Sequence, residues 1–429
     1  MGLPSLRVLL VIEECNPDWS SVPLEGYHYF RTLNALVDVT LVTHERNRSA
    51  LEKVDIPPST IVYISESQLT QRYYQWVLRL IPQGMNNWPL FHALTYPIYA
   101  EFNHQVYQQF HTAVEAGVYD LVHALTPMMP RYPVQLVQAC QTTPFVLGPV
   151  NGGIPFPAGF SDIAKQEFAF LNFLRAWGRR LIPGYRQTYT QATRVLAGST
   201  YTYQLLKDLF PTAEDRIQIF YENGITEGVF APTPIASERP LKLLFVGRLV
   251  PYKCADVVIE ALSQLPVDLQ LQVQLTVVGD GPQRPLLAER VQQLKLEQQV
   301  QLVGWVPQLE TVAYYQTADV FCFPSVREFG GAVVLEAMAC GLPCIVVNYG
   351  GIGEYVTAET GIKLEPLSRS QLVTEVGQAI QTLLQDPERL QQMSEQAIQR
   401  AAAFQWPRKA QQLVDIYAEI LQPQPLLTR

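Results

Sequence analysis

Two glutamates in the second half of the chain, Glu328 and Glu336, flank a glycine pair with seven residues between them. The pair Gly330-Gly331 is followed by a run of good helix formers, 332–339, which predicts a helix beginning there. Glu328 should therefore lie in a loop at a helix N-terminus, and Glu336 should lie on the helix. The free backbone N–H groups at such a helix end suit a phosphate or sugar hydroxyls, with carboxylates nearby to accept hydrogen bonds from diols.

Two cations come earlier, after the apolar run 241–246 that predicts a buried parallel strand. Arg248 follows this run, and Lys253 lies five residues further on. Arg supplies a fork of donors and Lys a point charge, and together they suit a diphosphate at a strand end. Such cations can stabilise the negative charge that grows on a leaving phosphate. Taken alone, the two residues would more often be a solvated surface pair than a phosphate site.

Several further segments accompany these residues in a fixed order along the chain. They are Phe245–Leu249 with Lys253, Gly304–Pro307, Leu335–Ala339 and Gly350-Gly351. This ordered set resembles family four of the retaining glycosyltransferases, which carry a Glu-x7-Glu signature. The resemblance is strong over about residues 190–425 and weak before them. It implies an α/β GT-B fold of two Rossmann-like doubly wound domains facing a cleft, with a C-terminal helix returning to the first domain.

The resemblance also implies roles for single residues. Glu328 would be the carboxylate beside the donor hexose, stabilising an oxocarbenium-like centre or orienting the ring rather than acting as a nucleophile. Glu336 would accept hydrogen bonds from both ribose hydroxyls, the alternative being a buried structural carboxylate. The family commonly reads Glu-Gly-Phe-Gly where this chain has Glu328-Phe329-Gly330-Gly331, so Gly331 is the expected backbone contact to the hexose. The donor-binding set is then Gly247, Arg248, Lys253, Val306, Glu328, Gly330, Gly331, Ala332 and Glu336.

Four positions, Val306, His123, Asn223 and Gly26, are further candidates, and each also has a structural interpretation or lies outside the main motifs. Val306 would offer backbone contacts to the nucleobase, or would simply belong to a strand-ending turn. His123, at the end of an expected strand, would hydrogen-bond the donor sugar and join Glu328, Arg248 and Lys253 as a catalytic residue, the alternative being a structural role. Asn223 is a hinge turn, a cleft contact or both. Gly26 is a candidate for the diphosphate side of the cleft.

Apolar runs of strand length alternate with helical segments throughout, which predicts two doubly wound domains. Gly26 is expected to open a helix reaching Leu36, and Gly148-Pro149 to end a strand. The stretch 231–237 is the best linker. We therefore predict an acceptor-binding Rossmann-like domain over 1–232, a nucleotide-sugar-binding one over 238–405, and a helix over 406–429 that packs back on the first. The expected strands are near 6–12, 37–42, 61–64, 119–123, 144–147, 193–197, 217–220, 241–246, 273–278, 300–303, 319–323, 343–347 and 361–364.

Composition narrows the class of protein. The 429 residues, 48% of them hydrophobic, carry a net charge of −8, which argues against a general nucleic-acid binder. The six cysteines lie mostly in apolar runs and are expected to be reduced in a cytoplasmic enzyme. No signal peptide or membrane-spanning run is expected. The Phe, Trp and Arg residues of 168–186 favour either peripheral contact with a membrane face or lipid-linked acceptor, or an amphipathic helix packed on its own domain.

The sequence thus predicts a retaining hexosyltransferase. Its donor would be a UDP- or GDP-sugar, and its acceptor a hydroxyl of a glycan, glycolipid or small molecule. No carboxylate pair with metal-ligand spacing stands at a strand end, and the family generally needs no divalent ion, so neither a metal nor another cofactor is expected. The alternatives are a phosphorylase- or epimerase-like enzyme of the same fold and a non-catalytic glycosyltransferase-like subunit.

Overall fold

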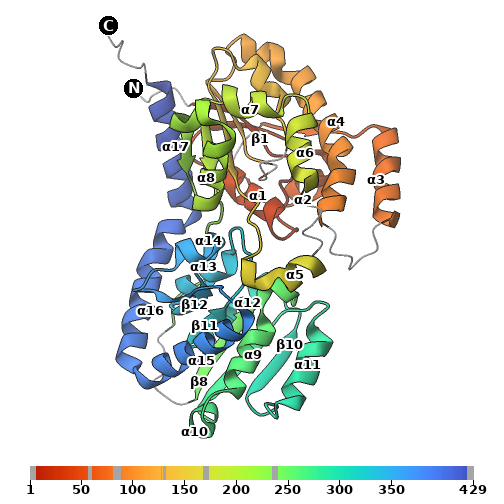
Figure 1. Cartoon of the computed structure of the whole chain (residues 1–429). Helices are drawn as coiled ribbons and strands as arrows, with labels where there is room; N and C mark the ends of the chain where they lie inside the picture. Colours follow the sequence, from red (N-terminus) through yellow and green to blue (C-terminus); the bar gives the residue numbers. More distant parts are fainter. Residues whose placement is uncertain are drawn as a thin grey trace. The chain divides into compact units, whose positions relative to one another are not determined.

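The computed structural model describes residues 6–56, 60–80, 88–126, 128, 132–167, 173–233 and 240–422, and the side chains of these except 88–93 and 173–176. The chain divides into two compact units (Figure 1). The first unit consists of Met1–Gly153, Phe168–Glu222 and Trp406–Arg429, and the second consists of Ile154–Glu167 and Asn223–Gln405.

A seven-stranded parallel sheet forms the centre of the first unit, in the order β3-β2-β1-β4-β5-β6-β7. Its first strand in the sequence, β1, reads RVLLV, and Val8 to Val11 are all buried, as expected of a parallel strand covered on both faces. The strand order reverses between β1 and β4. The strands are β1 (Arg7–Val11), β2 (Asp38–His44), β3 (Thr60–Ile64), β4 (Leu121–Ala124), β5 (Phe145–Val150), β6 (Arg194–Ala197) and β7 (Ile217–Ile219).

Helices cover both faces of this sheet (Figure 1). Successive residues of β1 serve opposite faces, because side chains alternate along a strand. Leu9 shares a buried cluster with Phe102 of α4, whereas Leu10 shares one with Phe30 of α1 and Leu413 of α17. The α-helices are α1 (Val22–Leu33), α2 (Arg48–Leu51), α3 (Gln68–Leu80), α4 (Trp88–Glu115), α6 (Phe173–Leu181), α7 (Tyr185–Gln191), α8 (Thr200–Leu209) and α17 (Trp406–Leu421), and the 3-10 helices are η1 (Glu45–Asn47), η2 (Gln135–Ala139) and η5 (Pro211–Arg216).

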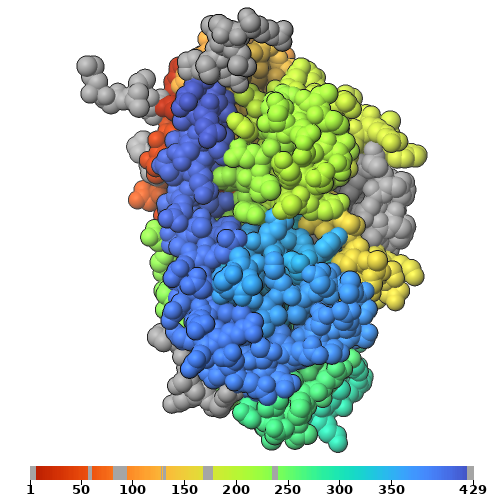
Figure 2. All heavy atoms as spheres, turned by 60° about the vertical axis from the view of Figure 1, so that its left-hand side comes forward, coloured from red at the N-terminus to blue at the C-terminus, as the bar shows by residue number. Residues whose placement is uncertain are grey.

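Helix α17 joins the first unit although it comes last in the sequence. Figure 2 shows it in dark blue along the surface of this unit, beside the yellow-green segment. Trp406 at its start stacks on His28 with ring centroids 5.2 Å apart and meets Tyr29 edge-on at 4.8 Å. Lys409, one turn on, is buried and donates a hydrogen bond to the carbonyl of Tyr221. These contacts fix the helix against α1.

Two sequence expectations in the first unit are wrong. The helix expected to open at Gly26 begins at Val22, because Pro23 occupies its first turn, where a missing N–H costs nothing. Gly26 lies inside this helix, where a Cβ would come 2.5 Å from the carbonyl oxygen of Glu14. The strand expected to end at Gly148-Pro149 continues to Val150, because β5 accommodates the pair as an irregularity in its pairing with β6.

The second unit contains a six-stranded parallel sheet in the order β10-β9-β8-β11-β12-β13. As in the first unit, the order reverses beside the first strand, here between β8 and β11. Ligands bind outside the carboxyl ends of the strands at such a topological switch point. The strands are β8 (Leu241–Val246), β9 (Val273–Val278), β10 (Val300–Gly304), β11 (Val320–Phe323), β12 (Cys344–Val347) and β13 (Gly361–Leu364).

Helices surround the second sheet as well (Figure 1). The segment 154–167 belongs to this unit although 55 residues of the first unit, 168–222, separate it from the rest. Of the expected linker, Ala231 to Thr233 are described and the rest lies outside the described residues. The α-helices are α5 (Ser161–Gln166), α9 (Ala255–Ser263), α10 (Val267–Gln270), α11 (Arg284–Gln293), α12 (Gln308–Thr317), α13 (Ala332–Ala339), α14 (Gly350–Tyr355), α15 (Arg369–Gln385) and α16 (Pro387–Ala401), with 3-10 helices η3 (Ala158–Phe160), η6 (Pro251–Lys253) and η7 (Ala402–Phe404).

The doubly wound architecture predicted from the alternation of strands and helices is confirmed in both units. No helix in the described part of the chain is long and apolar enough to cross a membrane.

Candidate functional site

Three charged residues that the sequence singled out, Arg248, Lys253 and Glu328, follow the strands at the switch point of the second sheet. Val246 ends β8, and Phe323 ends the neighbouring strand β11. The segments that follow these strands carry Arg248, Lys253 and Glu328. Hydrogen bonds join the two segments: the N–H of Val326 donates to the carbonyl of Tyr252 at 2.9 Å, and the hydroxyl of Ser325 donates to it at 3.3 Å.

Lys253 and Glu328 form an ion pair at this point. The lysine Nζ lies 3.1 Å from Glu328 Oε2, and the two side chains are 14% and 17% exposed. Ser325 donates a hydrogen bond to the same carboxylate oxygen at 3.2 Å. The Lys253 ammonium also lies over the ring of Phe323, 4.9 Å from its centroid. The sequence placed both charges at strand ends, and the structure brings them into direct contact.

Two charged residues of the site were missed by the sequence reasoning. Arg327 is partly buried, donates through Nε to the carbonyl of Ile154 at 3.1 Å, and lies over the rings of Phe156 and Phe329. Burial lowers its pKa, while Glu167 and Glu328 act in the opposite direction. Its position next to Glu328 in the sequence could have indicated that Arg327 belongs to the site.

Glu167 is the second missed residue. It is buried, and its burial raises the pKa of the carboxyl while Arg327 and Arg248 lower it. The site of the second unit therefore combines three cations with two carboxylates. Glu167 follows α5, which precedes Arg248 by about 80 residues and carries no motif, so the sequence offered no signal for it.

Close backbone packing holds the glycine loop. Gly331 adopts φ 77° and ψ 60°, a left-handed conformation that glycine adopts without strain, and stands directly before α13. A Cβ at Gly331 would lie 2.4 Å from Ile352, and one at Gly350 would lie 2.2 Å from the carbonyl oxygen of Glu328. The N–H of Gly351 donates to the carbonyls of Glu328 and Phe329 at 3.2 and 3.1 Å. The start of α14 thus fixes the loop that carries Glu328.

The start of α13 completes this loop. Gly330 is buried, and Ala332 is the first residue of the helix. The first N–H groups of an α-helix have no carbonyl partner within it, so they can serve an anion or a hydroxyl.

Glu336 lies on α13 and is buried, at 6% exposed. Its Oε1 accepts a hydrogen bond from Gln308 Nε2 at 2.8 Å, and its Oε2 accepts one from the hydroxyl of Tyr315 at 3.0 Å. Burial raises the pKa of the carboxyl, and the two hydrogen bonds oppose that shift. Each carboxylate oxygen can accept more than one hydrogen bond, so Glu336 retains capacity for a ligand.

Gly247 and Val306 lie at the ends of β8 and β10. A Cβ at Gly247 would come 3.1 Å from the Phe323 ring and 3.4 Å from Lys253 Cδ, so only glycine lets these side chains approach the strand end. Val306 is half-buried in the turn after β10, beside Trp305, which is 74% exposed. Gln308, whose side chain donates a hydrogen bond to Glu336, is the first residue of the next helix, α12.

Asn223 also belongs to the second unit, where it is buried. Its Nδ2 donates to the hydroxyl of Tyr355 at 3.2 Å. Tyr355 ends α14, the helix whose start packs on the Glu328 loop. The residue is thus connected to the site through one short helix.

His123 and Gly26 belong to the first unit and are not part of this charge cluster. His123 is fully buried; its Nδ1 lies 2.5 Å from the hydroxyl of Tyr417 and its Nε2 lies 2.5 Å from the carbonyl of Gly148. Burial lowers the pKa of the ring to about 4. Both ring nitrogens are engaged, and these contacts tie β4 to β5 and α17. The contact of His123 with a donor sugar stays a prediction.

Among the residues that the structure describes, no three His, Cys, Asp or Glu side chains gather as metal ligands would. The expectation that no divalent ion takes part stays a prediction.

Residues 232–400, which span the site from Arg248 to Glu336, match the family of glycosyl transferases group 1. A D-inositol 3-phosphate glycosyltransferase from Thermobispora bispora is 30% identical over 292 residues, which cover 63% of this chain and 66% of that protein. A glycogen synthase from Mycobacterium tuberculosis is 32% identical over 215 residues, covering 48% and 50% respectively. The chain thus spans between 50% and 66% of the length of these relatives.

Solved structures resemble the chain over nearly its whole length. A glycosyltransferase from Rickettsia africae superposes with a TM-score of 0.65 at 17% identity, covering 98% of this chain and 100% of that one. HepE from Anabaena, solved in complex with UDP-glucose, superposes with a TM-score of 0.62 at 18% identity, covering 96% and 100%. These likenesses confirm the predicted GT-B fold.

Proposed function

We propose that the chain is a retaining glycosyltransferase that moves a hexose from a nucleotide diphosphate sugar to an acceptor hydroxyl. The observation that carries this proposal is the Lys253–Glu328 ion pair at the switch point of the second sheet, 3.1 Å apart, with Arg248 on the same segment as the lysine. A cation for a diphosphate and a carboxylate for a sugar stand together there. The match of residues 232–400 to the glycosyl transferases group 1 supports it.

The proposed roles follow from charge and position. Arg248 and Lys253 would bind the diphosphate and stabilise the charge that grows on it as the bond from the anomeric carbon to phosphate oxygen breaks. Glu328 would lie beside the oxocarbenium-like centre, held by Ser325. The acceptor oxygen would form the new bond on the same face, and its proton would pass to the departing phosphate. Gly331 and the first N–H groups of α13 would contact the hexose, Glu336 the ribose and the Val306 backbone the base.

The donor is proposed to be a UDP- or GDP-sugar. One structural relative was solved with UDP-glucose, and this chain shares its fold. Three cations in the site could contact a diphosphate directly, in the place of a divalent ion, so we propose a metal-independent reaction.

A donor screen tests this function. We expect the purified protein to release UDP or GDP from one nucleotide hexose, and to do so with EDTA present, faster when a saccharide acceptor is supplied. NMR of the product should show the anomeric configuration of the donor retained. Sugar release that requires inorganic phosphate would instead identify a phosphorylase, and a product epimerised without transfer would identify an epimerase. No nucleotide binding by calorimetry would indicate a non-catalytic subunit and overturn the proposal.

We further propose that α6 contacts a membrane face. Residues 168–172 of the candidate stretch lie outside the described residues, but Trp177 and Leu181 on α6 are 60% and 71% exposed. Arg180 and Arg186 nearby are exposed as well. Exposed apolar side chains beside basic ones are typical of an interfacial helix.

In a flotation assay at low salt we expect binding to vesicles with anionic lipid and not to neutral ones. The double variant W177A/L181S should bind about tenfold more weakly, since it removes the two large exposed apolar side chains that the structure describes on this helix. A matched change on α17, Leu421→Ser, should have no effect. Equal flotation of all three proteins, or none by the unsubstituted chain, would contradict the proposal.

A further inference from the structure

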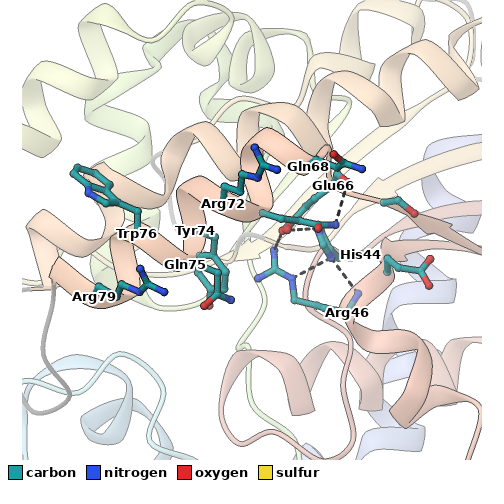
Figure 3. Close-up of a pocket in the computed structure, with 12 residues that line it drawn as sticks. His44, Arg46, Glu66, Gln68, Arg72, Tyr74, Gln75, Trp76 and Arg79 are labelled. Atoms are coloured by element: carbon teal, nitrogen blue, oxygen red, sulfur yellow. Dashed lines mark hydrogen bonds and ion pairs between the residues drawn. The ribbon is translucent and has the colours of Figure 1, made fainter.

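A second candidate site lies in the first unit, whereas the charge cluster described above belongs to the second. A cavity of about 1040 Å³ opens outside the carboxyl ends of β2 and β3, at one edge of the sheet (Figure 3). His44 ends β2, Glu66 follows β3, and α3 supplies the remaining wall with Arg72, Trp76 and Arg79. We call it the α3 cavity. Its volume is ample for a saccharide.

One end of the α3 cavity is a fixed polar network, drawn with dashed lines in Figure 3. The His44 Nε2 lies 2.8 Å from Glu66 Oε1, and the Arg46 guanidinium lies 3.0 Å from the same oxygen. Arg46 also donates through Nε to His44 Nδ1 at 3.0 Å. The charges of Arg46 and Glu66 therefore compensate each other, and this end of the cavity is built without a ligand.

The α3 wall carries charge that is not compensated. Arg72 and Arg79 are seven residues apart, which is about two helical turns and puts them on one face of α3. Within the described ranges, neither guanidinium forms an ion pair with a carboxylate. Glu45, the other acidic residue lining the cavity, pairs at 2.5 Å with Arg48. The α3 cavity thus has a surplus of positive charge.

An aromatic ring lies between these two cations in the sequence and on the same face. Trp76 lines the cavity and is 51% exposed. An exposed indole offers a flat apolar surface with one N–H donor, which fits the C–H face of a sugar ring. The amides of Gln68 and Gln75, which also line the cavity, can pair with ring hydroxyls. A guanidinium binds phosphate or carboxylate through two parallel N–H groups.

We propose that the α3 cavity binds an anionic saccharide, a sugar or cyclitol ring that carries a phosphate or carboxylate. The ring packs on Trp76, and Arg72 and Arg79 bind the acidic group. In an enzyme that transfers glycosyl groups this ligand is the acceptor, and that assignment alone rests on the proposed function. The binding itself does not depend on it.

Quenching of tryptophan fluorescence, without any donor present, measures the binding. We expect glucose 6-phosphate or glucuronate to quench at concentrations at which glucose and inorganic phosphate each do not. The double variant R72Q/R79Q should raise the Kd at least about tenfold, as expected from losing charged hydrogen bonds to the acid. Trp76→Leu should abolish the quenching. The matched controls are Arg408→Gln, an exposed arginine on α17, and Trp19→Phe, a tryptophan 42% exposed outside the cavity.

A second arm offers the same chemistry on a lipid. Binding to phosphatidylinositol vesicles that depends on Arg72 and Arg79, with no binding of the soluble sugar acids, identifies a lipid-borne headgroup as the ligand. Equal binding of phosphate and glucose 6-phosphate, or a Kd unchanged in R72Q/R79Q in both arms, would overturn the inference. The substituted side chains are exposed, so thermal unfolding should not change. Binding without any glycosyl transfer would leave the cavity assigned and refute the proposed function instead.

Discussion

Replacing Lys253 with alanine should lower kcat/KM for the nucleotide sugar by about 100- to 1,000-fold, or about 2.7–4 kcal/mol of transition-state stabilisation. The ion pair with Glu328, at 3.1 Å, fixes the position of the ammonium, so a diphosphate would meet a cation already in place. Glu328→Ala should reduce the rate to a similar degree, because it removes the carboxylate proposed to face the sugar. The measurement is nucleotide release under kcat/KM conditions, with thermal unfolding followed in parallel.

The control for this prediction is Lys242→Ala, which removes an exposed lysine from the same strand, β8. This variant should keep a kcat/KM within about twofold of the value for the unsubstituted protein, because solvent ions screen a distant exposed charge. The Tm of the Lys253 variant should fall by only a few degrees, because both members of the pair are partly exposed. Rates like those of the unsubstituted protein in both site variants would refute the site assignment.

Glu336→Gln should raise the KM for the donor about 10- to 100-fold, by weakening hydrogen bonds to the ribose hydroxyls. The carboxylate is buried on α13, and its oxygens already accept bonds from Gln308 and Tyr315. If Glu336 had only a structural role, the substitution could also raise the KM by disturbing the site. The KM alone therefore does not distinguish ribose binding from a structural role. Glu336→Ala is expected to cost about 2 kcal/mol of stability, because it leaves the buried Tyr315 hydroxyl without its acceptor.

A deoxynucleotide separates the two roles of Glu336. The unsubstituted protein should bind a 2′-deoxy donor about tenfold more weakly than the ribose form, and this difference should vanish in Glu336→Gln. Glu310→Gln, on an exposed turn of α12, should keep the full difference. A penalty that persists in Glu336→Gln would leave the residue as a structural carboxylate only.

The sequence predicted best where local pattern and position coincide. The β8 run LKLLFV and its counterparts read as buried parallel strands because such strands are apolar on both faces. Glu328 and Lys253 could be placed together because both follow strands, and strand ends in a parallel sheet meet at one edge. Pro23 in the first turn of α1 is also a local signal of a helix start. The helix was instead predicted to begin at Gly26, three residues later.

Other features depend on contacts that no local pattern records. The ring of His123 is enclosed by a carbonyl 25 residues away and a hydroxyl 294 residues away, so its burial could not be foreseen from a strand-end position. Glu167 joins the cations of the second unit from a short segment inserted between two parts of the first. The α3 cavity likewise depends on two segments, 44–46 and 65–79, coming together.

The backbone contact between Gly350-Gly351 and the Glu328 loop has a consequence for engineering. A side chain at either glycine would overlap a carbonyl of that loop, at 2.2 and 2.1 Å from the Cβ. The loop that carries Glu328 and the first turn of α14 therefore cannot be exchanged independently. We expect donor preference to transfer between homologous enzymes only when the whole stretch 324–355 is grafted as one cassette, while shorter swaps that break the contact displace the carboxylate.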